Sequence, residues 1–209
     1  MLATIRNVYC VGRNYKLHAE ELGNAVPKSP MIFMKPTHAL VPMDGGDIVL
    51  PGGYGQVHYE AELVVRIGAA YERGMKAAAL VSDFALGIDF TLRDLQEELK
   101  QKQHPWLKAK GFRAAAPLTR FLPAAGTEIL EAASFSLRIN DDEVQRGHVR
   151  DMIFDVQTLI DHIGGHYGLA EGDVIYTGTP AGVGRIADGD RMALYWGEEQ
   201  LGSCRVCLA

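Results

Sequence analysis

Short apolar runs, rather than long helical patterns, dominate this chain and constrain its fold most. Such runs, bounded by Gly, Pro, Asn or Asp, are typical of β-strands. We expect strands over residues 4–11, 31–35, 47–50, 60–67, 137–139, 174–177, 191–196 and 200–206. The sequence Asn-Asp-Asp at 140–142 predicts a hairpin turn that connects 137–139 to 143–145.

Helical patterns are fewer. Segment 91–102 begins with a capping-box-like pattern and spaces its leucines as a buried helix face does. Segment 151–167 carries an apolar stripe and ends near a pair of glycines, and a short helix is expected over 17–22. Because strands and helices do not alternate regularly, the sequence predicts an α+β fold, mainly β, with mostly antiparallel pairing.

The length, the net charge and the lack of long apolar runs limit which classes of protein this chain can belong to. The chain has 209 residues and a formal net charge of −5, which predicts one domain over 1–209 and no basic surface for nucleic acid. No apolar run approaches the roughly 18 residues of a membrane span. Residues 1–15 lack a signal-peptide pattern, so we expect a cytoplasmic protein without a membrane partner.

Cys204 and Cys207 have CxxC spacing but no second pair, and we interpret them as reduced thiols on a C-terminal strand.

Two carboxylates alternate along one expected strand. Glu60 and Glu62 should share a face of that strand, where a bound cation would relieve their repulsion, although a solvated face would look the same. Asp89 ends the apolar run 84–89 and adds a third acid. Three carboxylates without a Cys or His cluster favour Mg²⁺ or Mn²⁺. His58 could be a fourth ligand or a supporting core residue.

Other polar residues stand where they could serve such a site. Arg93 and Gln96 lie three apart on the helix after Asp89, and the arginine could clamp a carboxylate or pair with a neighbouring acid. His18 and Glu21 have the spacing of a general-base dyad or of an exposed ion pair.

Two lysines and one loop complete the candidate residues. Lys35 and Lys110 stand in apolar sequence, where they are either buried beside an anion or reach the surface. The Gly-rich loop 177–184 follows a strand but matches neither a Walker A loop nor GxGxxG, so its Thr179 is expected to bind a small anion. Serine-hydrolase and zinc-protease motifs are absent from the sequence.

A set of motifs in fixed order resembles the fumarylacetoacetate hydrolase family, in its short single-domain acylpyruvate hydrolase branch. The motifs are Tyr9-Cys-Val-Gly-Arg-Asn-Tyr15, His18 with Glu21, Phe33-Met-Lys-Pro36, His58-Tyr-Glu-Ala-Glu-Leu63, Gly87-Ile-Asp-Phe-Thr-Leu-Arg-Asp94, Pro105-Trp-Leu-Lys-Ala-Lys-Gly-Phe112, Asp151-Met-Ile-Phe154 and Tyr176-Thr-Gly-Thr-Pro-Ala-Gly-Val-Gly184. The match spans nearly the whole chain and is more specific for family than for substrate.

The resemblance implies a mixed β-sandwich roll, a homodimer and a role for each candidate residue. Metal ligands for Mg²⁺ or Mn²⁺ would be Glu60, Glu62 and Asp89. Catalytic residues would be His18 and Glu21 as the water-activating dyad, and Lys110 beside the metal and the oxyanion. Residues binding the oxo-acid substrate would be Arg13, Lys35, Arg93, Gln96 and Thr179.

The implied reaction is hydrolysis of the C–C bond of a 2,4-dioxo acid, such as fumarylpyruvate or acetylpyruvate, to pyruvate and a carboxylic acid. The same metal–enolate chemistry would serve an oxaloacetate decarboxylase or tautomerase, or an isomerase of 2-hydroxyhepta-2,4-diene-1,7-dioate. A third alternative is a metal-dependent module that binds small acids without turnover.

Overall fold

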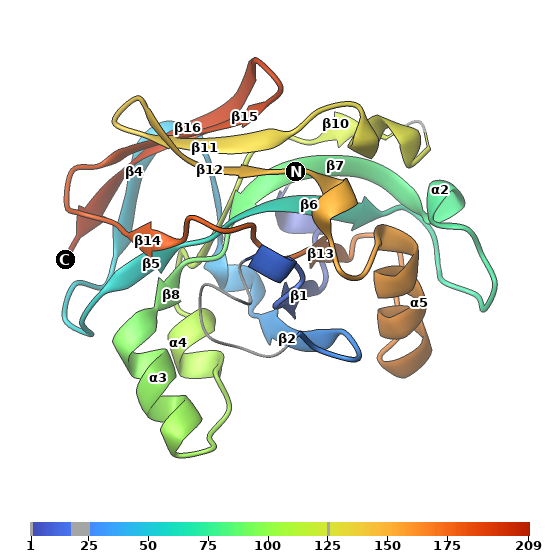
Figure 1. Ribbon diagram of the computed structural model, residues 1–209, viewed down its shortest axis with the longest axis horizontal. Helices are drawn as coiled ribbons and strands as arrows, with labels where there is room; N and C mark the ends of the chain where they lie inside the picture. The colour runs from blue at the N-terminus through green and yellow to red at the C-terminus, as the bar shows by residue number, and fades with distance from the viewer. Residues whose placement is uncertain (1, 18–25, 125) are drawn as a thin grey trace.

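The computed structural model describes residues 2–17, 26–124 and 126–209, which form three β-sheets and a few short helices (Figure 1). The largest sheet has the order β2 (Met31–Lys35), β1 (Val8–Gly12), β13 (Val174–Tyr176), β6 (Ala61–Ile67), β7 (Val81–Ile88), β9 (Ala116–Leu118) and β3 (Leu40–Pro42), with β10 (Leu122–Pro123) beside β7. A second sheet has the order β12 (Asp142–Gly147), β11 (Phe135–Ile139), β15 (Arg191–Trp196), β16 (Glu199–Leu208) and β4 (Asp44–Leu50). The third and smallest contains β14 (Gly184–Arg185), β5 (Val57–Tyr59) and β8 (Thr91–Leu92).

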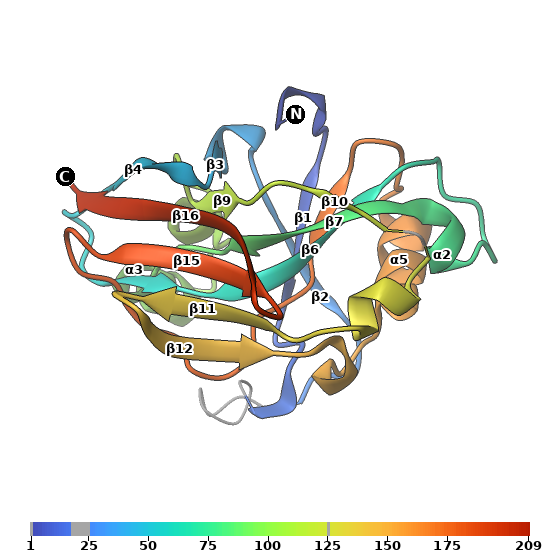
Figure 2. The ribbon, with the colours of Figure 1, turned by 90° about the horizontal axis from the view of Figure 1, so that it is seen from above.

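The two larger sheets pack face to face. Figure 2 shows the sheet of β11, β12, β15 and β16 lying over β6 and β7. The rings of Phe84 and Trp196 meet between them with centroids 4.9 Å apart. Most strand pairs are antiparallel, while β1–β13, β3–β9 and β4–β16 run parallel. The predicted α+β class and the mixed sandwich are therefore confirmed.

Short helices flank the sheets. The α-helices whose bounds lie within the described residues are α2 (Ala77–Leu80), α3 (Arg93–Gln101), α4 (Leu107–Lys110) and α5 (Val156–His166), and the 3-10 helices there are η1 (Leu2–Thr4), η2 (Thr37–Ala39), η3 (Glu128–Glu131) and η4 (Val149–Asp151). Helices α3 and α4 pack together beside β8, and α5 packs against α2 at the far end of the large sheet (Figure 1). No helix within 2–17, 26–124 and 126–209 is long and apolar enough to cross a membrane.

The structure moves several expected boundaries. The expected strand 4–11 starts only at Val8, because the preceding residues form η1 and the amide of Ile5 bonds back to Leu2. The helix expected over 91–102 begins two residues later, at Arg93. Thr91 and Leu92 form β8 instead, because Leu92 pairs with Val57 on β5. The expected helix 151–167 begins later, at Val156, where the Asp155 side chain caps the amide of Thr158 at 2.8 Å.

One more expectation needs correction: Glu60 does not lie inside a strand. The chain leaves the small sheet after β5 and enters the large sheet at β6, and Glu60 is the residue between them.

The predicted hairpin is confirmed, because Asn140 and Asp141 both adopt positive φ between β11 and β12. Cys204 and Cys207 are free thiols on β16, as interpreted. The expected helix 17–22 lies largely outside the described residues.

Strands β6 and β7 form the centre of the core. Residues 61–65 and 84–88 are buried, which explains why, apart from Glu62, their sequences read as apolar runs. Replacement of Leu63 by Ala should lower the free energy of unfolding by about 2–5 kcal/mol, because it opens a cavity in a fully buried strand. Urea denaturation measures this loss. Val49→Ala is the control, because Val49 is 59% exposed on β4, and an equal loss in that variant would contradict this view of the core.

Candidate functional site

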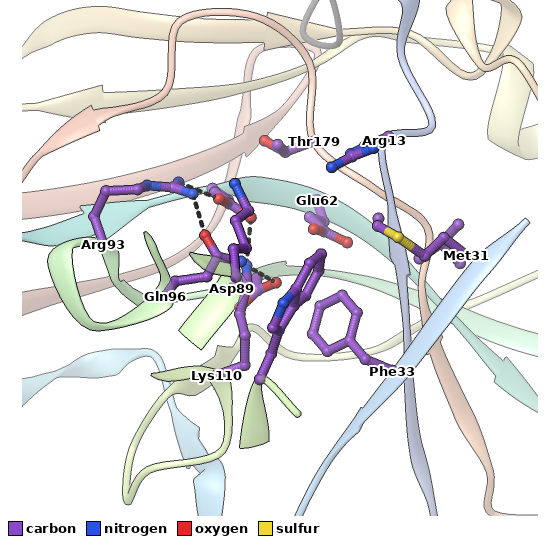
Figure 3. Close-up of a pocket in the computed structure, with 14 residues that line it drawn as sticks. Arg13, Met31, Phe33, Glu62, Asp89, Arg93, Gln96, Lys110 and Thr179 are labelled. Atoms are coloured by element: carbon purple, nitrogen blue, oxygen red, sulfur yellow. Dashed lines mark hydrogen bonds and ion pairs between the residues drawn. The ribbon is translucent and has the colours of Figure 1, made fainter. Parts of the chain in front are cut away.

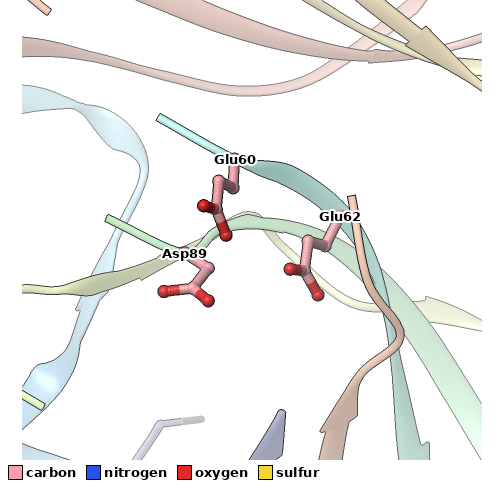
Figure 4. A group of neighbouring side chains, drawn as sticks. All are labelled: Glu60, Glu62 and Asp89. Atoms are coloured by element: carbon pink, nitrogen blue, oxygen red, sulfur yellow. The ribbon is translucent and has the colours of Figure 1, made fainter. Parts of the chain in front are cut away.

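Three acidic side chains meet near the point where the chain passes from β5 of the small sheet to β6 of the large sheet. Glu62 on β6 pairs in register with Gly87 on β7, which places Glu60 opposite Asp89, and the Asp89 amide donates to the Glu60 carbonyl at 2.8 Å. Carboxylate oxygens of all three lie within 4.8 Å of one another, and all three residues are buried (Figure 4). The predicted clustering of Glu60, Glu62 and Asp89 is thus present in the structure.

Both candidate lysines are buried against this acidic cluster. Lys110 Nζ donates to Glu60 Oε2 at 2.8 Å, to Asp89 Oδ2 at 2.7 Å and to Thr91 Oγ1 at 2.6 Å. Lys35 Nζ lies 2.7 Å from the other Asp89 oxygen and also bonds to the carbonyls of Phe90 and Lys110. Burial alone would lower the pKa of Lys110, but Asp89 and Glu60 outweigh it and raise that pKa, so the ammonium stays charged at neutral pH.

Arg93, at the start of α3, closes the acidic cluster from another side. Its three nitrogens contact Glu60 Oε1 at 2.5 Å, Gln96 Oε1 at 2.7 Å and His58 Nδ1 at 3.3 Å. Burial and then the charge of Arg93 lower the pKa of His58, so its imidazole is neutral and accepts from the arginine. With Nδ1 engaged there and Nε2 3.1 Å from Gln56 Oε1, His58 has the geometry of a supporting residue and not of a ligand.

Glu62 differs from the other two acids in its surroundings. The amide of Gly178 donates to Glu62 Oε2 at 2.7 Å, and no cationic side chain pairs with this carboxylate in the described part of the chain. Burial, followed by the charges of Asp89 and Glu60, raises the pKa of Glu62 well above its ordinary value. An all-oxygen cluster with one carboxylate destabilised in this way suits a hard divalent cation.

The Gly-rich loop is held against β6 by residues far away in sequence. Thr179 donates its hydroxyl to the Ala61 carbonyl at 2.8 Å, and Gln145 Nε2 donates to Thr179 Oγ1 at 2.9 Å. Gln145 also accepts from the Ala61 amide at 2.9 Å. Gly178 has φ +101, and a Cβ there would lie 2.7 Å from the Asn14 Cβ, so only glycine fits. Sequence reasoning missed Gln145, because nothing in its local sequence links it to residues 61 and 179.

A pocket opens above the acidic cluster. Arg13 faces it from the β1 end with φ 58, a strained conformation of the kind that often marks functional sites. Its guanidinium makes no hydrogen bond or ion pair within the described ranges. Figure 3 shows Arg13 beside Thr179, with Arg93 and Gln96 on a second side and Met31 and Phe33 on a third.

The pocket brings together most of the predicted residues. Arg13, Arg93, Gln96, Lys110 and Thr179 line it with the three acids, whereas Lys35 lies behind Asp89. Lining residues that sequence reasoning missed are Val11, Gly12, Met31, Phe33, Lys100 and Trp106. For Lys100 the available signal was its spacing of four and seven residues from Gln96 and Arg93 on one helix face. The predicted dyad of His18 and Glu21 lies outside the described residues.

Comparison with known proteins identifies relatives over nearly the full chain. Residues 7–209 match the family model of the fumarylacetoacetate (FAA) hydrolase C-terminal domain. Oxaloacetate tautomerase YcgM of Escherichia coli is 37% identical over 193 residues, covering 91% of this chain and 88% of its own. Mitochondrial oxaloacetate tautomerase fahd-1 of Caenorhabditis elegans is 40% identical over 195 residues, covering 90% and 91%.

A solved structure adds a ligand-bound relative. Fumarylpyruvate hydrolase from Pseudomonas aeruginosa, in complex with Mn²⁺ and pyruvate, superimposes with a TM-score of 0.90 at 34% identity, covering 98% of this chain and 91% of its own. The family model and the relatives show that this chain belongs to the fumarylacetoacetate hydrolase family.

Proposed function

We propose that this chain is a divalent-metal-dependent enzyme that stabilises the enolate of a 2-oxo acid, and that it interconverts the keto and enol forms of oxaloacetate. The observation that carries the proposal is the buried cluster of Glu60, Glu62 and Asp89 with the Lys110 ammonium held between two of its members. Relatives named oxaloacetate tautomerase at 37% and 40% identity favour this substrate.

The acidic cluster fits a divalent cation. Its three carboxylates would hold the ion, and Mg²⁺ and Mn²⁺ suit such oxygen ligands best. When bound, the ion would act as a Lewis acid on the oxygens of a 2-oxo acid. The Mn²⁺ complex of the fumarylpyruvate hydrolase supports this assignment.

Lys110 supplies the positive charge for the reaction. Tautomerisation moves a proton between C3 and the C2 oxygen of the substrate, and negative charge develops on that oxygen when C3 is deprotonated. The ammonium is fixed by three hydrogen bonds, to Glu60, Asp89 and Thr91, which use all of its N–H groups. It is therefore already oriented and would stabilise the enolate oxygen through its positive charge, without reorganisation. Lys35 neutralises Asp89 from behind and bonds to the Lys110 carbonyl, which keeps both groups in place.

The remaining pocket residues would orient the substrate. The Arg13 guanidinium beside Thr179 is suited to the C1 carboxylate, because Arg binds carboxylates through two parallel hydrogen bonds. The Gln96 carbonyl oxygen accepts from Arg93, which leaves its amide N–H groups to donate into the pocket. The Thr179 hydroxyl is already engaged by Ala61 and Gln145, so Thr179 would shape the pocket wall.

Acylpyruvate hydrolysis is the second candidate function. The specific observation in its favour is the structural similarity to the fumarylpyruvate hydrolase bound to pyruvate. Hydrolysis of an acylpyruvate needs the same enolate stabilisation and, in addition, a water activated for attack at C4. His18, oriented by Glu21, is the candidate general base for that additional step.

Removal of the Glu62 charge tests the metal site. Glu62→Gln should lose the stabilisation that Mn²⁺ gives the wild type, about 2.7 kcal/mol at a metal concentration 100-fold above Kd. Thermal unfolding with Mn²⁺ and with EDTA measures this. In EDTA the variant should be more stable than the wild type above pH 7, because it removes a buried charge.

The sign of the pH dependence follows from the raised pKa of Glu62. A raised pKa in the folded state means that the protonated form stabilises the metal-free wild type at low pH, and that this stabilisation is lost as the pH rises. The advantage of Glu62→Gln in EDTA should therefore shrink as the pH falls toward the ordinary range of a glutamate. Glu199→Gln, with a side chain 58% exposed, is the control, and equal Mn²⁺ effects in both variants would contradict the site.

Two variants separate the two reactions. Lys110→Met should reduce both oxaloacetate tautomerisation and acylpyruvate cleavage about 10²–10³-fold, because both need a stabilised enolate. His18→Ala should reduce cleavage about 10²–10⁴-fold and spare tautomerisation. Loss of enol absorbance follows the first reaction, and pyruvate release follows the second.

The matched control is Lys108→Met, because Lys108 is exposed on the same helix α4. Tautomerisation that survives in Lys110→Met, or that disappears equally in Lys108→Met, would refute the role of Lys110. Pyruvate release without tautomerase activity in the wild type would make hydrolysis the main function.

A further inference from the structure

One face of α3 brings a lysine to the pocket that the proposed reaction does not use. Arg93, Gln96 and Lys100 follow one another at intervals of three and four residues, and all three line the pocket. Side chains on a helix lean toward its N-terminus, which here is the end beside Glu60. The Lys100 side chain is 28% exposed, whereas the three acids are 1–6% exposed, so Lys100 lies at the mouth and the acidic cluster at the bottom.

Lys100 is loosely held, unlike the other pocket cations on this side. Within the described segments it forms an ion pair with Glu97 Oε2 at 3.3 Å, and that glutamate is 56% exposed. Exposed pairs of this kind stabilise a helix only weakly, so a bound anion can replace the glutamate. Arg93 and Lys110, by contrast, each contact three acceptors inside the site.

The wall opposite α3 offers little to an anion. Met31 and Phe33 come from β2, and the Phe33 ring meets the Trp106 ring edge-on at 6.0 Å. Arg13 lies with Thr179 on a third side and is suited to the carboxylate next to the oxo group. A second anionic group of the substrate, nearer the mouth, therefore has its best partner on α3.

The charge of the site also favours a dianion. The three acids are matched by three cations that contact them, Lys35, Arg93 and Lys110. These six charges cancel, so a bound divalent cation would give the pocket a net positive charge. The charges of Arg13 and Lys100 would add to it. A ligand with two carboxylates can satisfy this charge better than a ligand with one.

We propose that Lys100 determines specificity by binding the distal carboxylate of a 2-oxo dicarboxylic acid, an inference that rests on the proposed function. The distance from Gln96 to Lys100 along the helix is about 6 Å, on the scale of a four-carbon chain. Lys100 thereby selects diacids over uncharged analogues of the same length and takes no part in the proton transfer.

The test compares oxaloacetate with its C4 methyl ester, which enolises but lacks the distal charge. Lys100→Met should lower kcat/KM for oxaloacetate about tenfold, equivalent to about 1.4 kcal/mol. The loss should appear in KM with kcat unchanged, because the contact is the same in ground and transition states. The methyl ester should be turned over equally by the wild type and the variant.

Two further variants test whether the effect depends on the positive charge at position 100. Lys100→Arg should retain the preference for the diacid, because it keeps the charge. Lys102→Met is the control, since Lys102 follows α3, is 56% exposed, pairs with Glu98 and does not line the pocket. Equal losses on both substrates in Lys100→Met, no loss on either, or the same loss in Lys102→Met would overturn the proposal.

Failure of the proposed function would be recognised separately. If the wild type with Mn²⁺ turned over neither compound, the tautomerase assignment would fall. Calorimetric binding of oxaloacetate and its methyl ester to the same proteins would then decide the role of Lys100. A preference for the diacid that is lost in Lys100→Met supports the role, and unchanged relative affinities contradict it.

Discussion

The ammonium of Lys110, fixed between Glu60 and Asp89, is the interaction on which the rest of the site depends. Buried carboxylates repel one another and lose hydration, so a cluster of three can persist in a core only beside compensating cations. Lys110 contacts two of the acids and Lys35 takes the free oxygen of Asp89. Glu62 is left without a cationic side chain among the described residues, which is the position that a divalent ion would compensate.

The three acids and Lys110 come from separate elements of the fold. The change of sheet at Glu60 turns its side chain toward Asp89, and the antiparallel register of β6 and β7 sets Glu62 beside them. Lys110 reaches the same point from α4, which packs against α3, β2 and β8. Because each element is anchored in the core by its own apolar residues, the acidic cluster is assembled by folding and need not wait for a ligand.

Local spacing in the sequence encodes the acidic cluster and the two lysines beside it. The alternation of Glu60 and Glu62, the acid that ends the 84–89 run and the lysines in apolar sequence all led to residues that meet in space. Contacts between distant segments were missed, such as that of Gln145 with the Ala61 amide, 84 residues away. The strand break at Glu60 was also missed, because it follows from pairing partners, β8 and β7, that lie later in the chain.

Anomalous diffraction from crystals of this protein grown with Mn²⁺ and oxalate would test the central claim most directly. Oxalate is a stable analogue of the carboxylate and oxo oxygens of a 2-oxo acid. We expect one strong manganese peak in contact with Glu60, Glu62 and Asp89, with oxalate on the ion beside the Lys110 ammonium. A peak that leaves Glu62 uncoordinated, or no peak at the acidic cluster, would contradict the central claim.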